Sequence, residues 1–98
     1  YGDGVIKIIF TPGHTPGHQS VMVKLPKTGY MLFTGDACYT GDHWCDKCLP
    51  GLVSSSSDAA ASVKKLRRIA KEHDAKVVWG HDPVSWPGWK KAPMFYYD

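Results

Sequence analysis

Thr11-Pro-Gly-His14-Thr-Pro-Gly-His18-Gln-Ser20 is the stretch around which this chain is organised, and it directly follows the apolar run Val5–Phe10. Two imidazoles stand four residues apart in it, separated by a Pro-Gly pair, and a second Pro-Gly pair precedes them. Because proline fixes φ and glycine tolerates positive φ, the pattern predicts a rigid turn and excludes a helix. The histidines are therefore expected in a loop at a strand end. Since imidazole is the commonest side-chain metal ligand, a metal site is the first hypothesis.

The same form, an apolar run followed by glycine and then a ligand-type residue, occurs twice more. It recurs in Tyr30-Met-Leu-Phe-Thr-Gly-Asp36 and in Val77-Val-Trp-Gly-His81-Asp82. Taken singly, an Asp or His after a strand is usually a turn former or a surface residue. Three such strand ends in one chain favour a shared site, which makes His14, Asp36 and His81 candidate metal ligands. Spacing alone leaves His14 and His18 as alternatives for the first ligand.

Length and composition indicate one small globular unit. A chain of 98 residues makes at most one small domain with a modest core. Its 43% apolar and 21% charged residues are ordinary for such a chain, and no apolar run approaches the roughly 18 residues that span a membrane. Tyr1-Gly-Asp-Gly4 is expected to be a turn before a strand and not a leader, so the chain is expected to begin inside a larger protein.

The chain has a net charge of +3, and five of its 12 Lys and Arg residues lie in the segment 64–71. Without interleaved aromatic residues or a recognisable reading motif, this segment is expected to be the solvated side of a helix, and a nucleic-acid partner is not expected. The cations of the segment are Lys64, Lys65, Arg67, Arg68 and Lys71.

Three cysteines, Cys38, Cys45 and Cys48, argue against a closed disulfide framework and favour a reducing, cytoplasmic location. His43-Trp-Cys45-Asp-Lys-Cys48 offers three residues of the kind that bind zinc, but a second Cys-x-x-Cys or Cys-His pair is missing. A plain loop is therefore favoured over a structural zinc site or a redox pair.

The predicted elements place the candidate ligands at one edge of a sheet. A β-hairpin brings the loop after the first strand and the residue after the third strand to the same edge, so His14 and Asp36 can converge. We expect these two residues and His81 to lie within about 4–7 Å of one another, as a shared metal requires. The expected strands are Val5–Phe10, Ser20–Leu25, Tyr30–Thr34 and Ala75–Trp79, with a turn at Pro26–Gly29.

The remaining segments complete a mixed α/β (α+β) fold with one main helix. Ala37–Val53 has little periodicity and is expected to be a long loop. A residue of Ser54–Asp58 is expected to cap a helix that runs to about His73. The aromatic, Pro-rich tail from Pro83 to Tyr97 is expected to be irregular. The apolar side of the helix is Val63, Leu66, Ile69 and Ala70.

Thr11-Pro-Gly-His-Thr-Pro-Gly-His18, Phe33-Thr-Gly-Asp36 and Gly80-His81-Asp82 together resemble the C-terminal half of the metallo-β-lactamase superfamily. Asp36-Ala-Cys-Tyr39 and the ending from Gly80-His-Asp-Pro83 to Lys-Ala-Pro93 are most similar to the N-acyl-homoserine lactonases. The resemblance covers nearly the whole chain. It implies that residues 1–98 form half of an αββα sandwich, a hairpin sheet with one covering helix, within a metal-dependent hydrolase that opens lactone rings and so quenches quorum signals.

The resemblance also implies a role for each site residue. His14 would bind one metal, Asp36 would bridge two, and His81 would bind the second, while His18 would contact a ligand without binding metal. Tyr39, three residues after the bridging aspartate, would contact the substrate carbonyl and steady the opening ring. The oxygen and nitrogen donors suit one or two Zn²⁺ ions, with iron, manganese or cobalt as alternatives.

The family's His-x-His-x-Asp-His signature is absent from these 98 residues, so half of a site is expected. A half-sheet would leave an apolar face bare, to be covered by an N-terminal half or by a second copy of the chain. A thioester or another lactone as substrate, or a non-catalytic half-domain that binds a partner, are the alternatives. No membrane partner is expected. The residues expected to exceed what one helix can bury are Ile6, Ile8, Met22, Leu25, Leu32 and the tail aromatics.

Overall fold

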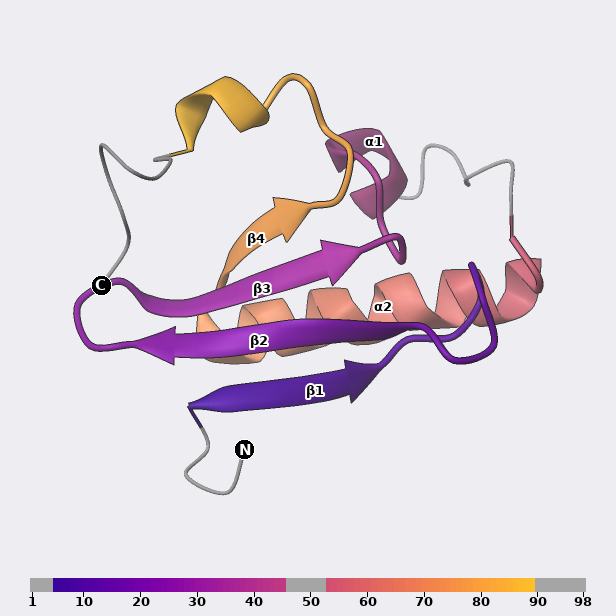
Figure 1. Cartoon of the computed structure of the whole chain (residues 1–98), viewed down its shortest axis with the longest axis horizontal. Helices are drawn as coiled ribbons and strands as arrows, with labels where there is room; N and C mark the ends of the chain where they lie inside the picture. The colour runs from indigo at the N-terminus through magenta and orange to yellow at the C-terminus, as the bar shows by residue number, and fades with distance from the viewer. Residues whose placement is uncertain (1–4, 46–52, 90–98) are drawn as a thin grey trace.

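The computed structural model describes residues 5–45 and 53–89, which form a four-stranded sheet with one long helix on it (Figure 1). The strands are β1 (Ile6–Phe10), β2 (Gln19–Leu25), β3 (Gly29–Gly35) and β4 (Lys76–Trp79). The helices are α1 (Gly41–Trp44), α2 (Ser56–His73) and the short 3-10 turn η1 (Trp86–Gly88).

Strand direction places three strand ends at one edge of the sheet. The strand order is β1-β2-β3-β4, in which β1 pairs antiparallel with β2, β2 antiparallel with β3, and β3 parallel with β4. The tight turn after Leu25 makes the β2–β3 hairpin, whereas the parallel β3–β4 pair needs the long crossover through α2. As a result β1, β3 and β4 all run in the same direction, and the residues that follow them meet at one edge.

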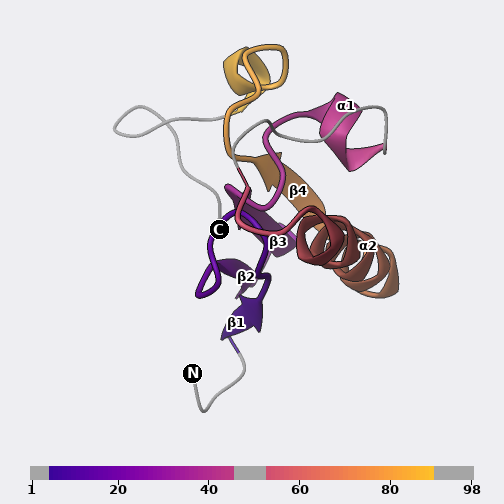
Figure 2. The same ribbon diagram turned by 90° about the vertical axis from the view of Figure 1, so that its right-hand side faces the viewer.

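Helix α2 covers one face of this sheet, as the edge-on view shows (Figure 2). Ser55 caps its first turn by accepting a hydrogen bond from the backbone N–H of Asp58, and Asp74 ends it in the left-handed conformation with φ of 49°. Its buried positions recur every three or four residues and pack on the apolar side of the strands. These positions are Ala59, Ser62, Val63, Leu66 and Ala70, and the strand residues in the same core are Ile9, Met22 and Leu32.

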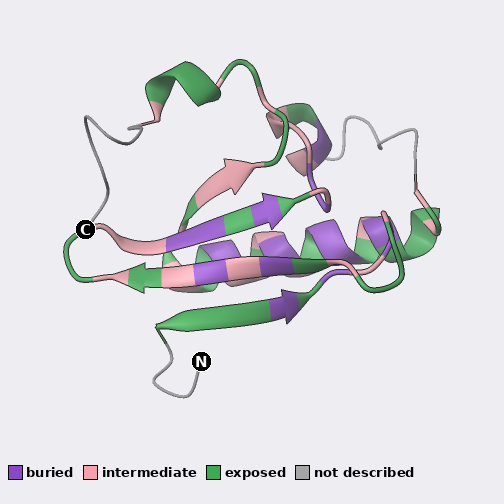
Figure 3. Ribbon diagram, in the orientation of Figure 1, coloured by how far each residue is buried: buried purple, intermediate pink, exposed green. Residues whose placement is uncertain are grey.

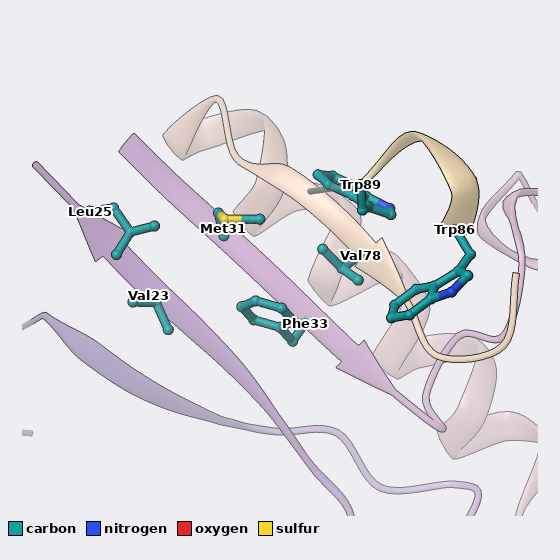
Figure 4. A pocket seen from close by; sticks show the side chains of 7 residues that line it. All are labelled: Val23, Leu25, Met31, Phe33, Val78, Trp86 and Trp89. Atoms are coloured by element: carbon teal, nitrogen blue, oxygen red, sulfur yellow. The ribbon is translucent and has the colours of Figure 1, made fainter. Parts of the chain in front are cut away.

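The other face of the sheet is apolar and largely uncovered by the described residues (Figure 3). Ile8, Val21, Phe33 and Val78 form one row across the four strands, since each lies opposite the next in the pairing register. Ile8 is 56% exposed and Phe33 40% exposed. A groove of about 360 Å³ runs along this face, and two tryptophans from the segment after β4 close one side of it (Figure 4). Its lining is Val23, Leu25, Met31, Phe33, Val78, Trp86 and Trp89.

The predicted fold class and the predicted strands and helix are confirmed, with boundaries that move by one or two residues. Two expectations were wrong. The segment Ala37–Val53 is not only loop, because Thr40 accepts a hydrogen bond from the N–H of His43 and caps the short helix α1. Met22 and Leu32 do not belong to the bare face, since alternate strand residues point to opposite sides and these two lie under α2.

Several expectations fall outside the described residues: the opening turn of residues 1–4, Cys48, and the tail beyond residue 89. Within residues 83–89, the tail is a turn followed by η1 instead of being fully irregular. Among the described helices, none combines the length and the hydropathy that a bilayer crossing requires.

We predict that Leu66→Ala lowers the free energy of unfolding by about 2–5 kcal/mol, because Leu66 is fully buried between α2 and the sheet and its loss leaves a cavity. Urea unfolding of the complete protein measures this change. Arg68→Ala, on the exposed side of the same helix, serves as the control and should change stability by no more than about 0.5 kcal/mol. Equal losses for both variants would contradict the packing described above.

Candidate metal centre

Asp36 and His81 meet because two glycines let the ends of β3 and β4 approach closely. Gly35 has φ of +57°, and a Cβ on Gly80 would overlap the carbonyl group of Gly35. The next backbone groups are tied together, since the N–H of Gly80 donates to Cys38 O and that of His81 to Tyr39 O, both at 3.0 Å. This pairing sets His81 opposite Asp36, with Nε2 at 2.7 Å from Oδ1.

The loop that carries His14 is held by a hydrogen bond across its base and by close packing on α2. The N–H of Thr11 donates to His18 O at 3.0 Å, which closes the base of the Pro-Gly turn. Gly13, with φ of +140°, packs so tightly that a Cβ there would overlap the backbone of Ala59. Further hydrogen bonds hold the loop, among them those from the N–H groups of Ser54 and Ser55 to Gly13 O and from the hydroxyl of Ser62 to Pro12 O.

The carboxylate of Asp36 is shared between the two imidazoles. Its Oδ2 lies 3.4 Å from Nε2 of His14, and its Oδ1 lies 2.7 Å from Nε2 of His81. The side chains of His14, Asp36 and His81 are 21%, 40% and 60% exposed, so the cluster opens to the surface of the described structure. The expected approach of His14 and of His81 to Asp36 is found, and each carboxylate oxygen faces a different imidazole.

His18 takes a different position from His14. Its Nε2 accepts a hydrogen bond from the backbone N–H of Asp36 at 3.0 Å, and its Nδ1 lies 2.9 Å from Oγ1 of Thr11. The imidazole therefore touches the backbone of Asp36, whereas His14 faces the carboxylate. The geometry distinguishes two histidines that sequence spacing left as alternatives.

Tyr39 lies between the candidate ligands. Its hydroxyl is 3.4 Å from Nδ1 of His14, and its ring stands edge-on to His81 with centroids 4.6 Å apart. Its N–H donates to Nδ1 of His43, which is 2% exposed, at 3.2 Å. Sequence reasoning did not predict that His43 supports Tyr39. The signal that points to it is the Thr40-x-x-His43 spacing at the start of α1, where a side chain in the first turn can reach back to a backbone N–H that precedes the helix.

His43 belongs to the sequence His43-Trp-Cys45-Asp-Lys-Cys48, which was considered as a zinc motif. In the structure its Nδ1 accepts a hydrogen bond from the backbone N–H of Tyr39. Cys48 lies outside the described residues, so the motif as a whole is not described. Cys38 is buried and Cys45 is exposed, and both are thiols.

The donor chemistry of the cluster fits a divalent metal only in part. Two imidazole nitrogens and two carboxylate oxygens are donors that Zn²⁺ accepts, but three side chains fall short of the four ligands of a closed tetrahedral site. Within residues 5–45 and 53–89, no three His, Cys, Asp or Glu side chains are spaced as they stand to hold one ion.

A cleft of about 490 Å³ begins beside His81 and continues toward the bare face of the sheet. Trp79, Asp82 and Trp86 contribute to its walls. It shares Phe33, Val78, Trp86 and Trp89 with the apolar groove of Figure 4, so the two hollows adjoin. His81 therefore lies in a cleft that adjoins the apolar groove.

The family model described as the metallo-beta-lactamase superfamily matches residues 1–81. The chain belongs to the metallo-β-lactamase superfamily. This confirms the resemblance found in the sequence, and membership implies a divalent metal ion. The mixed sheet covered by one helix is therefore part of a metallo-β-lactamase domain.

The chain is also similar to named lactonases within this superfamily. It is 57% identical over 98% of its length to the N-acyl homoserine lactonase AttM of Rhizobium radiobacter, and 34% identical over 92% of its length to an N-acyl homoserine lactonase of Bacillus cereus. It covers 36% of each of these relatives.

A solved structure agrees with these relatives. It is an N-acyl homoserine lactone hydrolase with the product N-hexanoyl-L-homoserine bound at its catalytic metal centre. The match has a TM-score of 0.85 and 30% identity, and covers 92% of this chain and 36% of that one. The chain thus spans little more than a third of the length of the lactonases it matches.

We predict that Gly80→Ala in the complete protein separates β4 from Gly35 and weakens metal binding, because the added Cβ overlaps the Gly35 carbonyl. We expect a loss of about 10–100-fold in metal affinity, the range for disturbing the groups that orient ligands. Competition with a chelating dye measures it. Gly17→Ala in the His14 loop, where a Cβ meets nothing within 4 Å, is the matched control and should keep its affinity. Unchanged affinity in Gly80→Ala would show that this close approach does not position His81.

Proposed function

We propose that this chain is the C-terminal half of a metal-dependent hydrolase that opens the lactone ring of N-acyl homoserine lactones. The observation that carries the proposal is the carboxylate of Asp36, which has one oxygen against His14 and the other against His81, with the hydroxyl of Tyr39 beside them. The relatives named as lactonases support the choice of substrate. Because the chain spans only part of them, the activity belongs to the complete protein.

In this proposal His14 would bind one zinc ion, His81 would bind a second, and Asp36 would be a ligand that the two ions share. A bound zinc ion brings the pKa of its water toward neutrality and polarises a carbonyl oxygen, which is the chemistry that hydrolysis requires. His18 holds the backbone of Asp36 and does not bind metal. The chain's own contribution is thus to fix three donors at one edge of a sheet.

Tyr39 is suited to act on the lactone carbonyl. Its hydroxyl lies beside His14 and its ring lies against His81, so a substrate held at the cluster would meet this donor. The backbone of Tyr39 is fixed on both sides, since its N–H donates to His43 and its carbonyl accepts from His81. A fixed donor beside the reacting carbonyl stabilises the negative charge that develops during ring opening.

The bare face of the sheet receives the rest of the domain in this proposal. Ile6, Ile8 and Phe10 are each at least 36% exposed, and the adjoining groove is apolar. Burying such a surface contributes about 25 cal/mol per Å² of apolar area, which favours a covering layer over contact with water. An N-terminal half of the domain that covers this face would also supply the metal ligands that are needed in addition to His14, Asp36 and His81. A second copy of this chain is the alternative covering.

We predict that the complete protein hydrolyses N-hexanoyl-L-homoserine lactone, that chelation abolishes the activity, and that added Zn²⁺ restores it. His14→Ala and Asp36→Asn should lose bound metal in elemental analysis and lose hydrolysis, because each removes a donor. His18→Ala should weaken metal binding less than His14→Ala, since it removes only a contact to the Asp36 backbone.

The same measurements of hydrolysis and metal content can also contradict the proposal. Full activity after chelation, or metal retained in Asp36→Asn, would show that the site is misplaced. Faster turnover of an acyl thioester than of the lactone would keep the site and change the substrate.

We predict that Tyr39→Phe in the complete protein keeps its metal and slows ring opening by roughly 10–10³-fold, because one donor to the carbonyl oxygen is lost while the ring contacts remain. Steady-state hydrolysis of the lactone, with metal content measured on the same sample, tests this. Tyr30→Phe is the matched control, as Tyr30 packs on His73 away from the cluster and should leave the rate unchanged. An unaffected Tyr39→Phe enzyme removes the main residue-level reason for choosing a lactone substrate.

A further inference from the structure

Two buried hydroxyl groups continue the contact between His18 and Asp36 into the sheet. Thr11 is 0% exposed and Ser20 is 1% exposed. Oγ1 of Thr11 lies 2.9 Å from Nδ1 of His18 and 2.9 Å from Oγ of Ser20. Ser20 Oγ in turn donates to the backbone carbonyl of Thr34 at 3.0 Å. Four groups from three strand ends therefore form one continuous chain.

The direction of every hydrogen bond in this chain follows from its two ends. Nε2 of His18 accepts from the N–H of Asp36, so in a neutral ring the proton must lie on Nδ1 and be donated to Thr11. The single proton of Ser20 goes to the carbonyl of Thr34, so Ser20 must accept from Thr11. Each donor is thus used once, from His18 through Thr11 and Ser20 to Thr34.

This order selects one tautomer of His18. A neutral imidazole carries its proton on either nitrogen, and the hydrogen bond at one nitrogen sets the role of the other. With Thr11 accepting at Nδ1, the lone pair of Nε2 is directed at the N–H of Asp36. In the other tautomer the proton on Nε2 of His18 would point at the N–H of Asp36, so two hydrogens would face each other. Oγ1 of Thr11 would also lose the hydrogen bond that it accepts from Nδ1 of His18.

We propose that Thr11 and Ser20 are positioning residues that hold His18 as the Nδ1–H tautomer and so fix the backbone of Asp36 in the metal centre. The inference rests on the proposed function, in which Asp36 is the bridging ligand. Asp36 follows Gly35, which has φ of +57° and gives this turn freedom that other residues would not. A hydrogen bond to the N–H of Asp36 restrains the backbone at that point.

Burial argues against the two hydroxyls being incidental. Thr11 and Ser20 are shielded from water, and a buried hydroxyl is unfavourable unless it is hydrogen-bonded. Valine has nearly the shape of threonine and would fill the same space at Thr11 without needing partners. A chain of hydroxyls here is explained by the need to present an acceptor to His18.

The test reads the tautomer directly by ¹⁵N NMR of the histidine rings in the complete protein, first after metal removal and then with Zn²⁺. We expect Thr11→Val to remove the slowly exchanging Nδ1–H signal of His18, to shift the Asp36 amide proton, and to weaken zinc affinity about 10–100-fold. Thr11→Ser keeps the hydroxyl and should preserve all three. Ser20→Ala should speed exchange of the Nδ1–H proton while leaving the tautomer in place.

Two controls separate positioning from stability. Thr15→Val makes the same substitution at an exposed position of the same loop, and should leave the His18 signals and the affinity unchanged. Val63→Ala lowers stability by truncating a buried residue of α2, replaces no member of the chain of hydroxyls, and should leave the His18 tautomer unchanged.

The outcomes also separate this inference from the proposed function. An unchanged tautomer and Asp36 amide in Thr11→Val, or an affinity loss no larger than that of Val63→Ala, would overturn the inference. If Thr11→Val does not fold, an unchanged Nδ1–H exchange rate in Ser20→Ala would overturn it instead. Zinc retained by Asp36→Asn would remove the proposed function, while the NMR result on the metal-free protein would still decide whether the chain fixes His18.

Discussion

The direction of the strands is the constraint on which the rest of this structure depends. Because β1, β3 and β4 run the same way, the residues after each of them meet at one edge, although they are far apart in the chain. The antiparallel turn and the crossover through α2 set these directions. Close packing then sets the distances, since Gly13 lies against α2 and Gly80 lies against Gly35 without a side chain between them. Topology brings the strand ends together, and the absence of a Cβ atom at Gly13 and Gly80 allows the backbones to come into contact.

Much of this arrangement could be predicted from the sequence because it depends on local chemistry. Pro-Gly pairs specify a turn, β-branched runs specify strands, and a glycine followed by Asp36 or His81 marks a strand end. The different contacts of His14 and His18 could not be predicted from spacing. They depend on which group each ring meets, and the partner of His18 is a backbone N–H 18 residues away.

Other features were missed for the same physical reason. The chain of hydroxyls joins Thr11 and Ser20 to the backbone carbonyl of Thr34, from three strand ends, and no short motif records such a contact. The side of the sheet to which Met22 and Leu32 point depends on register, which a list of apolar residues does not contain. The support of Tyr39 by His43 required the short helix α1, whose cap at Thr40 was not recognised in a segment of low periodicity. Side-chain direction, more than element position, limited the prediction.

The short strand β4 has a consequence for how long the proposed metal centre stays assembled. Four residues pair it to β3, and β3 is its sole neighbour in the described sheet, whereas His14 and Asp36 are carried by the longer meander of β1, β2 and β3. Segments with few hydrogen bonds open locally at a lower free energy than the whole domain. Fraying of β4 would carry His81 away while the other two donors stay in place. An ion bound by both His81 and Asp36 would hold β4 against β3. The rate of amide hydrogen exchange in β4 should therefore fall as the metal occupancy rises.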